Sequence, residues 1–377
     1  MHDTHKRSLD ALARRQRLRA LAPRRGLDFS SNDYLGLAES AELRAAAEEA
    51  LARGVPLGAG GSRLLRGNHP EHEALEADAA RHFGAEAALF FGGGFVANTA
   101  IFSTLPERGD LIVHDALIHA SVHEGFAGSR AEHVAFAHND ASAAEDVIRA
   151  WRAEGGKGRP WIAVESIYSM DGDAAPLDAI AAVARRHDAM LVIDEAHATG
   201  VLGPQGRGFG AQLEGREDII ALHTCGKALG VSGAIVTLPA ILRDYMVNRA
   251  RAFIYATAPS PLIASVVREA LKLTATREDL RARHAALVAH AGKLLAEACG
   301  VPSSGSHIQP VIVRHDQRAL SLATRMQDAG FDIRAVRPPT VPEGTARLRI
   351  SFTLNVTDDD VKRMADTLAD ALREVSA

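Results

Sequence analysis

The sequence is poor in cysteine, in aromatic residues and in long apolar runs. Its 377 residues include two cysteines, Cys225 and Cys299, and only 5% aromatic residues. Two cysteines without a CxxC pair exclude a disulfide framework and a cysteine-based zinc cluster, and they suit a reducing compartment. No apolar run approaches the roughly 18 residues that a membrane-spanning helix needs. We therefore expect a cytoplasmic protein without a membrane partner.

Neither sign of charge dominates the chain. It has 43 lysines and arginines against 47 aspartates and glutamates, for a net charge of −4 with histidine neutral. Without a basic excess we expect no nucleic-acid partner. With 47% apolar and 24% charged residues the composition is that of an ordinary globular protein. The length predicts two domains, or one large domain with a smaller appendage.

Basic residues crowd the N-terminus, as they do in a transit peptide. Asp3 and Asp10 interrupt them, however, and no apolar signal core follows. We expect an amphipathic helix here instead, with Leu9, Leu12 and Leu18 on its buried side.

Short apolar runs alternate with helical patterns along residues 87–236. This alternation predicts a mostly parallel sheet with helices on both faces. From about residue 262, long helices and a few short strands predict a smaller α+β domain. We therefore divide the chain into an N-terminal segment (1–36), a large cofactor-binding domain (37–261) and a small C-terminal domain (262–377). The strands expected in the large domain are 87–91, 111–113, 162–164, 190–193, 219–222 and 234–236.

A single lysine, Lys227, stands among small residues in the segment Leu222–Gly233. The apolar runs on either side of it predict two buried strands, joined by a turn that holds the lysine. A lysine on such a rigid, partly desolvated turn can lose its proton and form a Schiff base with a carbonyl compound. A solvated lysine on a surface turn is the simpler interpretation, because lysines are rarely buried.

The glycine run 92–94 follows one expected strand and precedes a helical pattern. A glycine turn at a helix N-terminus can bind a phosphate, because backbone N–H groups and the helix dipole both favour an anion there. A plain strand-to-helix turn remains the alternative at this point.

Four polar side chains lie at or just past the ends of expected strands: Ser169, Asp194, His197 and Thr224. In parallel sheets, ligands bind beyond the carboxyl ends of the strands. A Schiff-base lysine, a strand-end carboxylate and a phosphate site together point to pyridoxal phosphate, whose ring nitrogen stays protonated beside a carboxylate such as Asp194. Taken singly, Asp194 could equally be a turn residue and each histidine a structural hydrogen-bonding group.

These residues fall within motifs that resemble those of the α-oxoamine synthases, in the same order and over nearly the whole chain. The family consists of pyridoxal-phosphate enzymes of fold type I, the aspartate-aminotransferase fold. The resemblance implies an α/β protein whose large domain has a mainly parallel seven-stranded sheet, beside a smaller α+β domain. The motifs are Asn32-Asp-Tyr-Leu-Gly36, His119-Ala-Ser121, Ser169-Met-Asp-Gly-Asp173, Asp194-Glu-Ala-His-Ala-Thr-Gly200 and Thr224-Cys-Gly-Lys227.

The resemblance also implies a role for individual residues. Lys227 would carry the Schiff base, Asp194 would pair with the ring nitrogen and His119 would stack on the ring. Ser169 and His197 would bind the ring hydroxyl. The remaining cofactor contacts would come from Gly94, Phe95, Thr224 and, towards the neighbouring subunit's phosphate, Thr257; the substrate contacts would come from Arg19, Asn32, His119, Arg337 and Thr340.

Within the family, the segment Arg337–Arg349 most resembles the members that condense L-alanine with a pimeloyl thioester, of CoA or an acyl-carrier protein, in biotin synthesis. Lys227 would remove the Cα proton, and an arginine such as Arg337 would grip the alanine carboxylate at two points. The resemblance implies a homodimer with active sites at the subunit interface. Family members that use glycine with a short acyl-CoA, or serine with a long acyl thioester, are the alternatives.

Three other enzyme or motor classes share single motifs with the chain. The run 92–97 with Asp115 fits a loose dinucleotide fingerprint, so a nicotinamide oxidoreductase is possible, but it leaves Lys227 and Asp194 without roles. Residues 194–197 spell a helicase box, but no phosphate loop precedes them. His119 and His123 have the spacing of helical zinc ligands but lack an HExxH motif, and we expect no metal.

Overall fold

The computed structural model describes residues 2–376 and divides into two compact units. The larger unit comprises residues 35–169 and 174–282, and the smaller one comprises residues 1–34, 170–173 and 283–377. The smaller unit thus joins the N-terminal segment to the C-terminal quarter of the chain, and the larger unit extends past the boundary that we predicted at residue 261.

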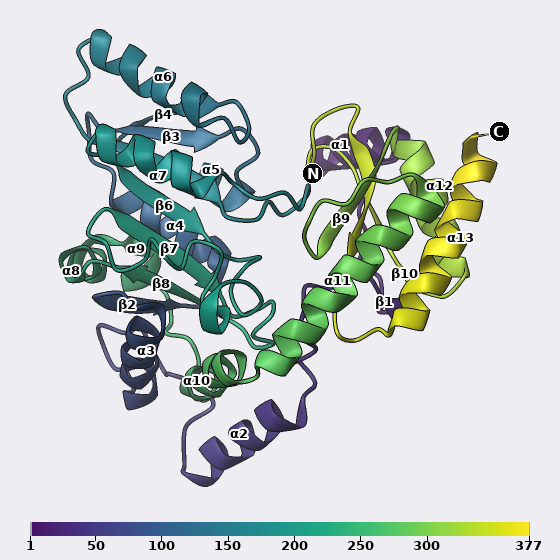
Figure 1. Cartoon of the computed structure of the whole chain (residues 1–377). Coiled ribbons are helices and arrows are strands. Elements are labelled where there is room, and N and C mark those ends of the chain that lie inside the picture. Colours follow the sequence, from purple (N-terminus) through teal and green to yellow (C-terminus); the bar gives the residue numbers. More distant parts are fainter. Residues whose placement is uncertain (1, 377) are drawn as a thin grey trace. The chain divides into compact units, whose positions relative to one another are not determined.

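A seven-stranded sheet forms the centre of the larger unit, with strand order β2-β8-β7-β6-β5-β3-β4 (Figure 1). Only β8 runs antiparallel to its neighbours, and the other pairings are parallel. The sheet confirms the predicted fold class. Its strands are β2 (Ala87–Phe91), β3 (Leu111–Asp115), β4 (Glu132–Phe136), β5 (Pro160–Glu165), β6 (Met190–Asp194), β7 (Ile219–Thr224) and β8 (Ala234–Leu238).

Helices cover both faces of this sheet, which explains why its central strands are buried along their whole length and carry continuous apolar runs rather than alternating ones. Successive residues point to opposite faces, so Ile112 and Val192 belong to one apolar cluster while Val113 and Ile193 belong to another. The first cluster includes residues of α4 (Gly94–Thr104), α5 (Ala120–Gly128), α8 (Ala240–Arg249) and α9 (Arg251–Ile254), and the second includes residues of α6 (Ala141–Ala153) and α7 (Leu177–Arg186).

Three further helices of the larger unit contact one another beside the sheet: α10 contacts both α2 and α3, and α3 contacts β2. Ser40 and Ser260 begin two of these helices by accepting backbone N–H groups with their side chains. These helices are α2 (Ala41–Ala52), α3 (Pro70–Phe83) and α10 (Pro261–Thr276); a short 3₁₀ helix, η1 (Pro204–Gly206), follows β6.

The smaller unit has its own apolar core, built on an antiparallel sheet of order β11-β12-β9 and a two-stranded parallel pair, β1 with β10. This agrees with the α+β composition predicted for the C-terminal part. Its strands are β1 (Leu27–Asp28), β9 (Ile308–Arg314), β10 (Phe331–Asp332), β11 (Arg334–Val336) and β12 (Ala346–Ser351). Its helices are α1 (Asp3–Arg14), α12 (Asp316–Asp328), α13 (Asp358–Ser376) and, from residue 283 onward, α11 (Glu278–Cys299).

One expectation about the N-terminus is wrong. The helix α1 is present, but none of its residues is buried, and Leu9, Leu12 and Leu18 are 53%, 36% and 50% exposed. Amphipathic spacing requires only that apolar side chains share a face; it does not supply a core to cover them. Among residues 2–376, no helix combines the length and the apolar character needed to cross a bilayer.

Candidate active site

The predicted lysine turn is present between β7 and β8. The Cys225 N–H donates to the carbonyl of Gly233 at 2.9 Å, which closes the turn at its base. Gly230 and Gly233 have φ values of +68° and +102°, which residues with a Cβ rarely adopt. Lys227 is half-buried, and its Nζ lies 2.7 Å from Nε2 of His197. The predicted turn between two buried strands is therefore confirmed, and its lysine is partly buried.

Asp194 ends β6 and is 6% exposed. Its Oδ2 accepts a hydrogen bond from Nδ2 of Asn98 at 2.7 Å, and its Oδ1 accepts from the backbone N–H of Ala196 at 2.9 Å. Both donors are neutral groups. These two contacts therefore orient the Asp194 carboxylate without cancelling its negative charge.

His119 immediately precedes α5, and its Nδ1 lies 3.2 Å from the backbone N–H of Ser121 that it caps. The ring is reached by solvent. Desolvation by the surrounding protein atoms lowers the pKa of His119; the Asp194 carboxylate opposes this change and the Lys227 ammonium adds to it. The three residues expected to surround the cofactor ring are thus electrostatic neighbours.

Sequence reasoning missed Glu165, the last residue of β5. It is 2% exposed and aligns with Asp194 on the neighbouring strand, and its Oε2 accepts the backbone N–H of Ser169 at 3.0 Å. Burial, and secondarily the Asp194 carboxylate, raise the pKa of Glu165 to about 8, while Lys227 opposes the shift. The only sequence signal was its position at a strand end, next to the predicted residue Ser169.

The glycine turn leads into α4, as predicted. Gly93 precedes the helix without any side-chain cap, so the first N–H groups of α4 are not taken by a capping side chain. A Cβ added at Gly92 or Gly93 would meet nothing within 4 Å, and one added at Gly94 would lie 3.7 Å from Oγ1 of Thr224. Thr224 and Gly94 are therefore neighbours at the carboxyl edge of the sheet, and an anion can approach the backbone there.

The remaining residues predicted for the larger unit differ in exposure. Phe95 is 51% exposed at the start of α4, Thr257 is exposed after α9, and Ser169 is buried. The larger unit thus contains every residue that we predicted to bind the cofactor: Gly94, Phe95, His119, Ser169, Asp194, His197, Thr224, Lys227 and Thr257.

The residues predicted only for substrate binding lie in the smaller unit. Nη2 of Arg19 donates to Oγ1 of Thr340 at 2.8 Å, and Nη1 of Arg337 donates to the carbonyl of Gln16. Arg19, Arg337 and Thr340 line a small pocket of about 140 Å³. Asn32 is not among its lining residues, because its side chain is turned to another arginine.

That arginine is Arg349 on β12, which the sequence analysis did not select. It is 8% exposed; its Nη2 donates to Oδ1 of Asn32 at 3.0 Å and its Nη1 donates to Oγ of Ser351 at 2.7 Å. Arg347, two residues earlier, donates to Asp171 at 2.6 Å. Two buried arginines spaced i,i+2 in an apolar strand were a usable signal, since arginine is almost never fully buried without a partner.

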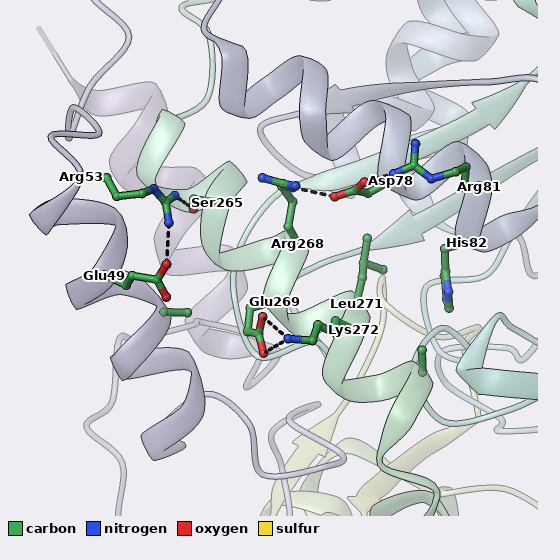
Figure 2. Close-up of a pocket in the computed structure, with 12 residues that line it drawn as sticks. Glu49, Arg53, Asp78, Arg81, His82, Ser265, Arg268, Glu269, Leu271 and Lys272 are labelled. Atoms are coloured by element: carbon green, nitrogen blue, oxygen red, sulfur yellow. Dashed lines mark hydrogen bonds and ion pairs between the residues drawn. The ribbon is translucent and has the colours of Figure 1, made fainter.

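A larger pocket of about 490 Å³ lies elsewhere in the larger unit, among α2, α3 and α10 (Figure 2). Its charged side chains are paired with one another: Arg268 with Asp78, and Lys272 with Glu269. None of the predicted site residues lines it. Because its charges are already paired, we do not assign the chemistry to this pocket.

Comparisons with known proteins agree with the motif-based resemblance. The chain is 41% identical over 369 residues to 8-amino-7-oxononanoate synthase of Geobacter sulfurreducens, covering 96% of this chain and 93% of the relative. It is 42% identical over 329 residues to the protein of the same name from Chromobacterium violaceum, covering 87% and 84%.

Solved structures that superimpose on this chain carry names from the same set of enzymes. The structure of 8-amino-7-oxononanoate synthase from Francisella tularensis superimposes with a TM-score of 0.79 at 28% identity, covering 93% of this chain and 99% of that one. Serine palmitoyltransferase of Sphingomonas wittichii superimposes with a TM-score of 0.86 at 28% identity, covering 92% and 87%. The family described as aminotransferase class I and II matches residues 24–368. With the fold, the predicted lysine turn and these matches in agreement, the chain belongs to the class I and II aminotransferase family.

Proposed function

We propose that the protein is an 8-amino-7-oxononanoate synthase. It condenses L-alanine with a pimeloyl thioester and releases CO2 and the free thiol, a step of biotin synthesis. The observation that carries this proposal is the Lys227 amine, held on the turn between β7 and β8 with its Nζ 2.7 Å from Nε2 of His197; Lys227 and the buried Asp194 both act electrostatically on Glu165 and His119. The names of relatives that are 40–42% identical over most of the chain support the choice of reaction.

The cofactor is pyridoxal 5'-phosphate, and the residues present fit it. Lys227 supplies the amine that holds the aldehyde, Asp194 supplies a carboxylate for the ring nitrogen, and the uncapped N-terminus of α4 beside Thr224 suits the phosphate. When bound, the cofactor supplies an electron sink for the carbanion at the substrate Cα and for the loss of CO2. We assign the ring face to His119, and the remaining contacts to Gly94, Phe95, Ser169, His197 and, in the neighbouring subunit, Thr257.

Lys227 also acts as the general base that takes the Cα proton of alanine at Nζ. Its amine must be unprotonated for this step, and Nε2 of His197 lies at hydrogen-bond distance to orient it. The half-buried position of Lys227 leaves it accessible to a bound substrate.

For the substrate carboxylate we propose Arg349 in place of Arg337. Arg349 is buried and held on two sides by Asn32 and Ser351, so its planar guanidinium is oriented for two parallel hydrogen bonds to a carboxylate. Arg337 is only partly buried and is held by a single contact among the described residues, with the Gln16 carbonyl, so its guanidinium is less firmly oriented. Asn32 then acts through Arg349, while Arg19, Arg337 and Thr340 contact the acyl substrate.

We also propose a cytoplasmic homodimer. Two large apolar side chains next to the candidate site residues, Phe95 and Tyr255, are 51% and 73% exposed. Exposed aromatic groups at a site favour coverage by a protein partner. A second copy of the chain would bury them and bring its Thr257 to the phosphate.

Product analysis tests the proposed function. The purified protein, loaded with pyridoxal phosphate, is offered alanine, glycine or serine, each with pimeloyl-, acetyl-, succinyl- or palmitoyl-CoA, and the products are identified by mass spectrometry. We expect efficient turnover only of alanine with pimeloyl-CoA.

A second function is favoured by one observation, the TM-score of 0.86 with serine palmitoyltransferase. Preferential turnover of serine with palmitoyl-CoA would establish that function instead. Preferential turnover of glycine with a short acyl-CoA would assign the chain to another branch of the family.

A further inference from the structure

A hydrogen-bonded chain of four side chains connects Asp194 to His119 through two residues that have no role in the mechanism above. We infer that Asn98 and Ser121 are positioning residues that hold His119 in its neutral form, with the proton on Nε2. The catalytic purpose of the neutral ring rests on the proposed function, whereas its protonation state is argued from hydrogen bonds alone.

The Asp194 carboxylate fixes the direction of the first two hydrogen bonds in the chain, and the backbone N–H of Ser121, which donates to Nδ1 of His119, fixes the third. Asp194 is a carboxylate and only accepts, so the amide nitrogen of Asn98 must face it, at 2.7 Å. The same nitrogen lies 3.0 Å from Oγ of Ser121 and donates its second hydrogen there. The Ser121 hydroxyl hydrogen is then directed to Nδ1 of His119, 2.8 Å away.

The His119 ring is therefore an acceptor at Nδ1. The backbone N–H of Ser121 also points at this atom, from 3.2 Å. With two donors facing Nδ1, the ring proton must sit on Nε2, and a second proton on Nδ1 would confront both donors.

Burial shields the two middle members of the chain from solvent. Asn98 and Ser121 are 2% and 0% exposed. Oδ1 of Asn98 has no hydrogen-bond partner among the described residues, so the amide forgoes one acceptor contact while both of its donor hydrogens are used. Turning the amide over would set that oxygen against the Asp194 carboxylate, which is unfavourable.

Burial and the charged groups around His119 also favour its neutral form. The titratable groups near it are Asp194 on β6, Lys227 after β7 and His123 on α5. Desolvation and Lys227 lower the pKa of His119, and Asp194 alone opposes them. If the His119 ring is neutral, Asp194 is the group that sets the charge at the pyridine nitrogen of the cofactor. A positively charged His119 ring stacked on the cofactor would instead repel the proton on that nitrogen.

Histidine NMR on the full-length protein tests the inference directly. The wild-type chain is labelled with ¹³C and ¹⁵N in its 17 histidines, with and without pyridoxal phosphate, and the His119 signals are assigned by comparison with His119→Gln. We expect the Nε2–H tautomer at pH 7 in both samples. An Nδ1–H tautomer or an imidazolium at pH 7 would overturn the inference without any variant.

Two kinds of variant separate positioning from general structural support. Ser121→Ala removes the donor to Nδ1, and we expect the apparent pKa of His119 to rise by about one pH unit. Asn98 does not contact His119, yet Asn98→Ala removes the hydrogen bond that orients the Ser121 hydroxyl, whose hydrogen can then rotate away from Nδ1, so the same upward shift is expected. Asn98→Leu, which retains volume, repeats the test if the smaller residue destabilises the protein.

Ser103→Ala is the matched control. Ser103 also lies on α4, but its hydroxyl donates to the Thr99 carbonyl in the same helix, and we expect no change in His119 titration. If the Asn98 variants leave the pKa of His119 unchanged, the inference is overturned. Failure of the proposed function would appear separately, as the absence of cofactor binding or of acyl transfer in the wild type, with the His119 tautomer unaffected.

Discussion

The two units hold their candidate functional residues in different ways. In the larger unit, Glu165 and Asp194 end two neighbouring strands of one sheet, and Lys227 follows a third. Their hydrogen-bond partners are buried side chains or backbone groups close to the same strand ends. In the smaller unit, arginines reach across more than 300 residues of sequence, from the N-terminal segment to the region of β12. The first set occupies fixed positions; the second consists of long side chains held by one or two contacts.

This difference suits the two tasks that we propose. Proton transfer and control of the ring charge need atoms placed within a fraction of an ångström, which the rigid edge of a sheet provides. Recognition of a carboxylate depends on charge and on a planar fork of donors, which a buried arginine supplies from a longer reach. Variants in the larger unit should therefore act on the chemical step, and variants in the smaller unit on substrate binding.

The strongest test of this contrast is Lys227→Ala. Without the amine, the variant lacks both the attachment for the cofactor and the general base, and we expect kcat to fall by at least about 10³-fold. The yellow absorbance of the bound cofactor should also be lost on dialysis. Lys272→Ala is the control, because Lys272 is 70% exposed and pairs with Glu269 in the pocket of Figure 2. Retained activity in Lys227→Ala would contradict the proposed chemistry.

The smaller unit is tested by comparing Arg349→Lys with Arg337→Lys. Lysine keeps the charge but cannot make the two parallel hydrogen bonds of the guanidinium. For Arg349→Lys we expect kcat/KM for alanine to fall by about 10- to 100-fold, mainly through a higher KM. This is the size of effect that the loss of one charge-assisted hydrogen bond produces. Arg337→Lys should change it by less than about threefold. The reverse order of effects would return the carboxylate role to Arg337.

A third prediction, on stability rather than activity, concerns pH and the buried Glu165. Its pKa is raised from 4.5 to about 8 in the folded chain, so between these values the unfolded state releases a proton that the folded state keeps. Stability therefore falls as pH rises through this window, by about 1.4 kcal/mol per pH unit. Glu165→Gln should remove that slope in urea unfolding of the cofactor-free protein between pH 5 and 8.

Glu48→Gln is the control for this measurement, because Glu48 is exposed on α2. It should leave the wild-type slope unchanged. An equal slope in wild type and Glu165→Gln would mean that Glu165 is already ionised in the folded protein near neutral pH.

Six strands of the large sheet could be predicted because each contains an uninterrupted apolar run. Strand β2 begins and ends where expected, and β5 and β6 differ by one or two residues at their ends. Strand β4 was missed: four of its five residues are exposed, so it lacks the apolar run that marks a buried strand. The apolar spacing of α1 was read correctly as a helix and wrongly as a buried one.

The sequence by itself determined the class of fold, the lysine turn and the strand-end residues, because these depend on local patterns of apolar, glycine and polar residues. Only the tertiary structure decided that Arg349, rather than Arg337, is held by Asn32, and that Asn98 and Ser121 connect Asp194 to His119. These contacts join residues up to 317 positions apart. No local pattern encodes them, because their hydrogen-bond geometry exists only once the strands and helices have packed together.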